Sequence, residues 1–279
     1  MSKTSTMDIL MLLKALLIGI VEGITEFLPI SSTGHMILVD EFVKLSTDKV
    51  FTAAFEVIIQ LGAIISVIVF FWKDLWPFAG TTEHKSQTWQ LWFKVIVGVI
   101  PAIVLGLLFD DAIEEHLFNS KVVAITLVFY GVALILLERR NAKKTNFKIN
   151  SVTSITFGLA IAIGCFQCLA MVPGTSRSAA TIIGAMLLGL SRGAAAEFSF
   201  FLAIPTMAGA TALKLYKNGF SFDAQQWLTL SVGFITAFVV AYIVIKFLMD
   251  FIRRHDFSVF GYYRIVLGIL VLFLLWNNS

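Results

Sequence analysis

Residues 22–35 read EGITEFLPISSTGH, a polar stretch between two apolar runs. Glu22 and Glu26 are four residues apart, which predicts that both lie on one face of a helix. Pro29 has no N–H group, so we expect that helix to end near Phe27. The serines, threonine and glycine that follow predict a polar turn, which caps a second helix and presents N–H groups to an anion.

The composition is that of a multi-pass membrane protein. Of the 279 residues, 58% are hydrophobic and 14% are charged, and the mean hydropathy is +0.88. A soluble domain is nearer half apolar and one quarter charged. The net charge of +3 is too small to indicate a nucleic-acid partner. Ionisable groups at membrane depth are costly, so those inside the apolar runs mark a functional site.

The apolar segments predict an all-α membrane protein with six transmembrane helices and two re-entrant hairpins. A spanning helix needs about 17 to 25 mostly apolar residues. Six stretches meet this requirement: 52–72, 91–109, 121–138, 195–213, 226–248 and 258–276. Two others, about 8–40 and 152–190, are apolar but broken by proline and polar residues. Because broken helices at membrane depth must be buried in protein or line a wet cavity, we expect both to be re-entrant helix–loop–helix hairpins.

The distribution of charge predicts the orientation of the spans. Basic residues collect at the cytoplasmic ends of membrane helices. They gather at 139–148 and flank the segments 73–94 and 249–257, whereas 110–120 is acidic. The basic residues at 139–148 are Arg139, Arg140, Lys143, Lys144 and Lys148. The acidic residues at 110–120 are Asp110, Asp111, Glu114 and Glu115. We therefore place 139–148 in the cytoplasm and 110–120 outside.

With these assignments, the first hairpin enters the membrane from outside and the second from the cytoplasm. Each half of the chain, 1–148 and 149–279, then holds one hairpin and three spans. Since three is odd, the halves are inverted repeats within a single membrane domain, with a site expected where the hairpin tips meet. The residues AAFE at 53–56 and AAEF at 195–198 give weak internal support.

A second polar stretch, PGTSRS at 173–178, lies in the other hairpin. Gly174 permits backbone conformations that other residues avoid, and Arg177 offers a permanent charge and a planar fork that fits phosphate oxygens. Alternatively, Arg177 only pairs with Glu22 or Glu26 and locks the two hairpins together. The predicted substrate-binding residues are Ser31 and Thr33 in the first stretch, and Gly174, Thr175, Ser176, Ser178 and Thr181 in the second.

A further carboxylate lies inside an apolar span. Glu56 is followed four residues later by Gln60, on the same helix face. We predict that both contribute to the substrate site, with packing against a buried hydroxyl as the alternative for Glu56. Glu197 occupies the corresponding place in the second half and is a weaker candidate.

These residue types together indicate phosphoryl transfer, in which catalysis is mostly positioning and charge stabilisation. Arg177 and the N–H groups would hold the phosphate. Glu22 and Glu26 would bind a divalent cation or orient His35, and their spacing does not separate the two roles. His35 would act as the nucleophile, or as base and acid for Ser32.

The motifs resemble those of the bacterial undecaprenyl pyrophosphate phosphatase family, also called the bacitracin-resistance protein family. The resemblance rests on EGITEFLPISSTGH, on PGTSRSAAT at 173–181 and on FEVIIQLGAI at 55–64, and it covers nearly the whole chain. It implies hydrolysis of undecaprenyl pyrophosphate to the monophosphate and inorganic phosphate, which recycles the lipid carrier of peptidoglycan synthesis. The family's functional residues fall on Glu22, Glu26, Ser32, His35 and Arg177, with Ser176 and Thr181 in the same second motif.

The resemblance also implies a divalent cation, Mg²⁺ or Ca²⁺, and a place in the bacterial inner (plasma) membrane. The orientation predicted from the charges places the opening of the active site at the outer face. The expected partners are the polyprenyl pyrophosphate and the bilayer. A homodimer is compatible with the glycine-rich helix at 98–106, which can pack within one chain or between chains. The main alternative function is a transporter or flippase for an anionic polyprenyl phosphate lipid, because inverted repeats with broken helices are a transporter design.

Overall fold

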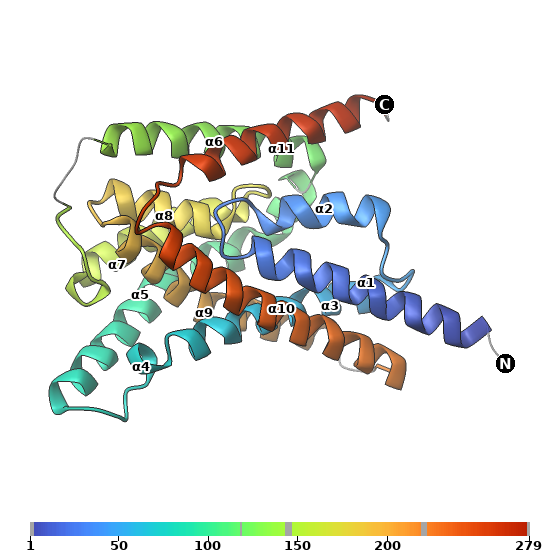
Figure 1. The fold of residues 1–279 in the computed structure, drawn as a ribbon, viewed down its shortest axis with the longest axis horizontal. Coiled ribbons are helices and arrows are strands. Elements are labelled where there is room, and N and C mark those ends of the chain that lie inside the picture. Colours follow the sequence, from blue (N-terminus) through green and yellow to red (C-terminus); the bar gives the residue numbers. More distant parts are fainter. Residues whose placement is uncertain (1–2, 118, 143–146, 219–221, 278–279) are drawn as a thin grey trace.

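The computed structural model describes residues 3–117, 119–142, 147–218 and 222–277, which fold almost entirely into helices (Figure 1). In chain order, these are α1 Lys3–Thr25, α2 Ser32–Phe42, α3 Lys49–Phe70, α4 Trp72–Leu75, α5 Thr82–Leu117, α6 Ser120–Asn141, the 3₁₀ turn η1 Val152–Ser154, α7 Phe157–Gln167, the 3₁₀ turn η2 Cys168–Met171, α8 Arg177–Leu187, α9 Arg192–Asn218, α10 Ala224–Phe251 and α11 Ser258–Asn277.

Each of the six predicted spans corresponds to a helix: α3, α5, α6, α9, α10 and α11. Among the described residues, the first five of these are long and apolar enough to cross a membrane, and the described part of α11 is an apolar helix of shorter length. The protein is therefore an all-helical, multi-pass membrane protein.

The boundaries of α5 differ from the prediction. The helix begins at Thr82 and continues to Leu117, so most of the predicted 110–120 loop is helical. The polar residues on both sides of the apolar run contain no glycine or proline that would stop the helix, and Pro101 is accommodated inside it. Lys94 lies within α5, where its ammonium donates to the carbonyl of Thr153 at 2.9 Å, so it is a buried contact and not a loop charge.

Several of the charges used to predict orientation also lie in helices. Arg139 and Arg140 belong to the last turn of α6. Lys143 and Lys144, and the side chains of Asp110, Asp111 and Glu114, lie outside the described residues.

Both broken stretches form helix–turn–helix hairpins. In the first, α1 ends at Thr25 and α2 begins at Ser32; in the second, α7 and η2 end at Met171 and α8 begins at Arg177. Figure 1 shows that the outer ends of α1 and α2 lie on the side of the two chain termini, whereas those of α7 and α8 lie on the opposite side. The tips of the two hairpins meet in the interior of the helix bundle.

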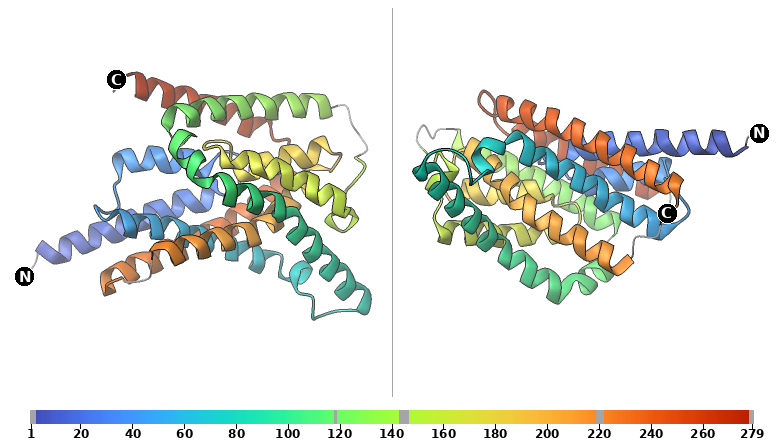
Figure 2. Two further views of the ribbon diagram at one scale, coloured as in Figure 1. Left: turned by 180° about the vertical axis from the view of Figure 1, so that it is seen from behind. Right: turned by 90° about the horizontal axis from the view of Figure 1, so that it is seen from below.

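The two halves interlock through matching helix pairs. The first arm of each hairpin packs on a long helix of the other half, α1 on α10 and α7 on α5, and α6 packs along α11. In Figure 2, α6 lies along α11 in the left view, and α1 lies beside α10 in the right view. Glycines permit these close approaches: a Cβ at Gly19 would lie 2.7 Å from the carbonyl oxygen of Gly233, and one at Gly164 would clash with that of Gly98. Gly98, in the glycine-rich part of α5, thus packs within the chain.

Phenylalanines of α9 form the centre of the largest apolar cluster. Phe198, Phe200 and Phe201 are fully buried, and Phe27 from the first hairpin packs edge-on against Phe200 with ring centroids 5.2 Å apart. This packing holds the first tip against α9. The buried carboxylate of Glu138 fixes the start of α11, because it accepts from the N–H of Phe257 at 3.0 Å as well as from the half-buried Arg192.

Candidate functional site

Two serines with unusual backbone angles shape the two tips. Ser31 and Ser176 are the non-glycine residues with positive φ in the described part of the chain, at 77° and 72°. Each caps the helix that follows, since the Ser31 hydroxyl accepts from the N–H of Gly34 and the Ser176 hydroxyl from that of Ala179. Such backbone strain costs about 1–3 kcal/mol per residue and clusters at functional sites. The capping predicted for the first tip is confirmed and recurs at the second.

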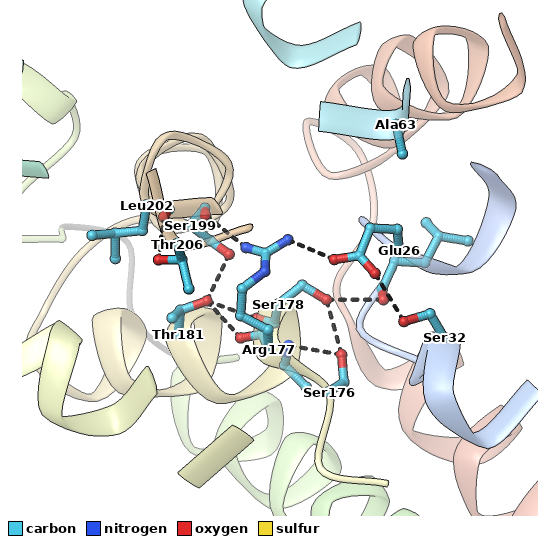
Figure 3. Close-up of polar contacts among 12 residues, drawn as sticks. Glu26, Ser32, Ala63, Ser176, Arg177, Ser178, Thr181, Ser199, Leu202 and Thr206 are labelled. Carbon is cyan, nitrogen blue, oxygen red and sulfur yellow. Dashed lines mark hydrogen bonds and ion pairs between the residues drawn. The ribbon is translucent and has the colours of Figure 1, made fainter. Parts of the chain in front are cut away.

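An ion pair between the tips is the centre of the site (Figure 3). Arg177 donates from Nη2 to Oε1 of Glu26 at 3.2 Å and from Nη1 to the carbonyl of Ser199 at 2.8 Å. The two charged side chains are only 11% and 6% exposed. The pairing weighed in the sequence analysis therefore exists, and α9 supplies an anchor for the guanidinium that the motifs did not reveal.

The hydroxyl of Ser32 also bonds to this carboxylate. It donates to Oε2 of Glu26 at 2.8 Å, so Glu26 bridges Ser32 and Arg177 (Figure 3). His35, one turn further along α2, has other partners: its Nδ1 contacts the carbonyl of Ser31 and its Nε2 contacts the hydroxyl of Tyr263, both at 2.7 Å. Among the described residues no hydrogen bond joins His35 to Ser32, whose hydroxyl is bonded to the stronger acceptor, the carboxylate of Glu26; both roles considered for His35 stay predictions.

A buried arginine that the sequence analysis missed holds the two tips together. Arg264 of α11 is fully buried and donates to Pro29 of the first tip and to Gly174 and Thr175 of the second, at 3.2, 2.8 and 3.0 Å. The signal was available, because an arginine within the apolar run 258–276 is a costly group that needs a reason.

The other hydroxyls of the second motif have protein partners. Ser178 donates to the carbonyl of Leu28 at 3.0 Å, a further bond between the tips. Thr181 donates to the carbonyl of Arg177 at 2.8 Å and lies 2.6 Å from the hydroxyl of Ser199. These hydroxyl protons are engaged in shaping the tip, so direct substrate binding by Ser178 and Thr181 stays a prediction.

The remaining predicted residues surround this centre. Gly174 has φ of 85°, and a Cβ there would meet Thr126 and Val123, so glycine is required for the tip to pack on α6. Thr175 is fully buried. Thr33 is half-buried in the first turn of α2.

Glu56 and Gln60 lie apart from the Arg177–Glu26 pair. Glu56 lines a hollow between α1, α2 and α3 together with Asp40 and Met36, and Gln60 is one turn further along α3. Within the described residues, no hydrogen bond joins Glu56 or Gln60 to the two tips. Their predicted contact with the substrate is therefore still a prediction.

Among the described residues, three buried polar atoms of the predicted site have no hydrogen-bond partner: Oε1 of Glu22, the Nε group of Arg177 and Oγ1 of Thr175. Leaving such a group unpaired costs about 1–3 kcal/mol, so these atoms are available to a ligand. Glu22 is only 1% exposed. The site thus combines a free acceptor, a free donor, a permanent cation and a serine hydroxyl bonded to a carboxylate, which suits binding and transfer of a phosphate group.

Comparison with known proteins gives a consistent picture. A family model described as "Bacitracin resistance protein BacA" matches residues 15–270. Among curated relatives, "Undecaprenyl-diphosphatase 1" of Clostridioides difficile is 57% identical over 96% of this chain and 97% of its own length. "Undecaprenyl-diphosphatase" of Enterococcus faecalis is 53% identical over 95% and 98%. "Undecaprenyl-diphosphatase" of Fusobacterium nucleatum is 56% identical over 93% and 99%.

Proposed function

The chain belongs to the bacitracin resistance protein BacA family, and on that premise we propose that it hydrolyses undecaprenyl pyrophosphate to undecaprenyl phosphate and inorganic phosphate. The reaction is a phosphatase reaction carried out in the bacterial plasma membrane. It returns the lipid carrier to cell-wall synthesis.

The hydrogen bonding of Arg177 is the observation that supports its role as the phosphate-binding residue. Its two terminal nitrogens are held by Glu26 and by the carbonyl of Ser199, which fixes the plane of the guanidinium, while its Nε group has no acceptor. An oxygen of the terminal phosphate supplies that acceptor. Positioning by a fixed cation is the main contribution that a protein makes to phosphoryl transfer.

The Ser32–Glu26 bond suggests how the reaction begins. Ser32 already donates its proton to Glu26. When its oxygen attacks the terminal phosphorus, that proton moves to the carboxylate, and the bridging P–O bond breaks to release undecaprenyl phosphate. Water then hydrolyses the phosphoserine, which releases inorganic phosphate and restores the hydroxyl. Direct attack by water, with Glu26 as the base, uses the same geometry without the covalent step.

A divalent cation fits the residues on the first tip. Both oxygens of Glu26 are engaged, whereas Oε1 of Glu22 is buried and unpartnered. Carboxylate oxygens are the ligands that Mg²⁺ and Ca²⁺ prefer. No group of three or more acidic, histidine or cysteine side chains suited to a metal occurs in the described part of the chain. Glu22 would therefore hold a cation jointly with the diphosphate, and the cation would neutralise charge on the phosphate oxygens.

We further propose that the two halves, 1–148 and 149–279, are inverted repeats with six spans and two re-entrant hairpins. Support comes from the matching helix pairs, the two serine caps with positive φ, and the opposite sides on which the hairpins begin (Figure 1). An exposed row of aromatic residues whose rings contact one another, from Trp72 to Phe93, marks one membrane interface, beside Lys73 and Lys85. With that interface in the cytoplasm, the first hairpin opens to the outer face.

The phosphatase proposal is tested with purified protein in detergent. We expect inorganic phosphate to be released from undecaprenyl pyrophosphate in the absence of any membrane gradient. The His35→Ala variant should lose turnover while keeping its thermal unfolding profile. A flippase remains the second candidate, because two oppositely inserted hairpins suit alternating access. It would be favoured if detergent samples release no phosphate while proteoliposomes move the monophosphate lipid between leaflets.

A further inference from the structure

Tyr263 of α11 lies against His35, a contact that joins the last helix of the chain to the first hairpin. The phenol oxygen is 2.7 Å from Nε2 of His35, and the two rings are stacked with centroids 5.6 Å apart and planes inclined by 3°. Neither the composition of α11 nor the motifs pointed to this tyrosine. On the basis of the proposed function, we propose that Tyr263 is a positioning residue. Its hydroxyl helps to hold the imidazole of His35 in one tautomer and fixes the direction of the lone pair of Nε2.

The tautomer follows from the partners of the two ring nitrogens. Nδ1 of His35 lies 2.7 Å from the carbonyl oxygen of Ser31. A carbonyl can only accept a hydrogen bond, so Nδ1 carries the proton. In the neutral imidazole, Nε2 is then unprotonated and accepts from the hydroxyl of Tyr263. The carbonyl of Ser31, which needs a donor at Nδ1, and the hydroxyl of Tyr263, which donates to Nε2, together select this tautomer, and Tyr263 also determines where the lone pair of Nε2 points.

The position of Tyr263 is itself fixed by the next residue. Arg264 is fully buried and bonded to carbonyls of both tips, whereas Tyr263 is 44% exposed. On a helix, successive side chains point about 100° apart, so anchoring Arg264 sets the rotation of α11. The same anchor fixes the height of the helix relative to α2. Arg264, which joins the two tips, therefore also sets the position at which the hydroxyl of Tyr263 contacts His35.

This arrangement gives Nε2 of His35 a defined role. Because the ring is held on both nitrogens, it loses little freedom when the substrate arrives, and it keeps one basic nitrogen at a fixed site. The hydroxyl of Tyr263 must rotate away before Nε2 accepts a proton from water or from the substrate. Loss of the hydroxyl should leave the ring free to change tautomer, without removing a group that binds the phosphate.

The matched variants are Tyr263→Phe and Tyr262→Phe. Both remove one hydroxyl and keep the ring; Tyr262 is 53% exposed and has no hydrogen bond among the described residues. We expect Tyr263→Phe to lower kcat about fivefold to tenfold, as for the loss of one hydrogen bond, with KM changed by less than about twofold. Tyr262→Phe should change neither. A rise in KM alone, or equal kcat values in the two variants, would overturn the proposal.

A spectroscopic measurement tests the tautomer without relying on activity. Full-length protein labelled with ¹⁵N-histidine contains four histidines, and His35→Asn identifies the signals of His35 by their absence. In the unmodified protein, the ¹⁵N chemical shift of Nδ1 should be that of a protonated nitrogen and that of Nε2 that of an unprotonated one. In Tyr263→Phe both tautomers should be populated, so the two chemical shifts should move toward each other. An unchanged His35 spectrum in Tyr263→Phe would refute the role of Tyr263. Absence of phosphate release by the unmodified protein would refute only the proposed function, since the spectrum still decides the tautomer.

Discussion

Replacing Arg264 with methionine tests whether the two tips are held together by this one side chain. Methionine has a similar length and suits an apolar helix, so the variant removes the charge and the donors with little change in volume. Arg264 donates to Pro29, Gly174 and Thr175, which belong to the tips, and more weakly to the carbonyls of Thr126 and Leu127 at 3.5 and 3.4 Å.

The magnitude follows from the three tip carbonyls. Leaving a buried carbonyl without a donor costs about 1–3 kcal/mol, so three of them cost about 3–9 kcal/mol. Part of this is offset, because the variant no longer buries a guanidinium that lacks a carboxylate partner. We expect a net loss of about 3 kcal/mol, or a fall in Tm of about 6–12 °C. Because the predicted catalytic and substrate-binding side chains lie on the two tips, their displacement should lower kcat by at least about tenfold at temperatures where the variant is folded.

The assay combines thermal unfolding in detergent with phosphate release. Arg253→Met is the matched control: Arg253 is 75% exposed and pairs with Asp250 at 3.5 Å, the kind of surface pair that contributes about 0–1 kcal/mol. If Arg264→Met unfolds at the same temperature as Arg253→Met and retains full kcat, the tips are held by other contacts and the reasoning is wrong.

Three further predictions concern the site and the packing of the halves. Arg177→Ala should abolish turnover in a folded protein, and measurable kcat above a few per cent of the normal value would remove it from the catalytic set. Glu22→Gln should raise the Mg²⁺ concentration needed for half-maximal activity, whereas Glu26→Gln should lower kcat without moving the metal titration; identical titrations for both variants would argue against metal binding by Glu22. Gly164→Ala should lower Tm by several degrees, because the added methyl group meets a backbone oxygen of α5, whereas Gly158→Ala, which meets open space, should not.

Composition, apolar period and motif spacing are enough to establish that this is a membrane protein and to predict where its polar site lies. A mean hydropathy of +0.88 and runs of about 20 apolar residues require membrane helices, since backbone groups in a bilayer must be paired within the segment. The breaks at Pro29 and Pro173 located the two tips, because each of these prolines is followed by glycine, serine and threonine residues that favour a turn, whereas Pro101 and Pro205 lie in apolar runs and are accommodated inside helices. These are local properties, readable from composition, period and spacing.

Which side chains meet depends on how the helices pack, and the local patterns do not contain this information. Glu26 pairs with Arg177 across 150 intervening residues, the anchor of that pair is a carbonyl of α9, and Arg264 and Tyr263 reach the tips from the last helix. The bond of Ser32 to Glu26 could not be predicted from the spacing of the residues either. Such contacts depend on how packed helices are rotated relative to one another. Because successive side chains on a helix point about 100° apart, this rotation decides whether a given side chain faces the site or the lipid.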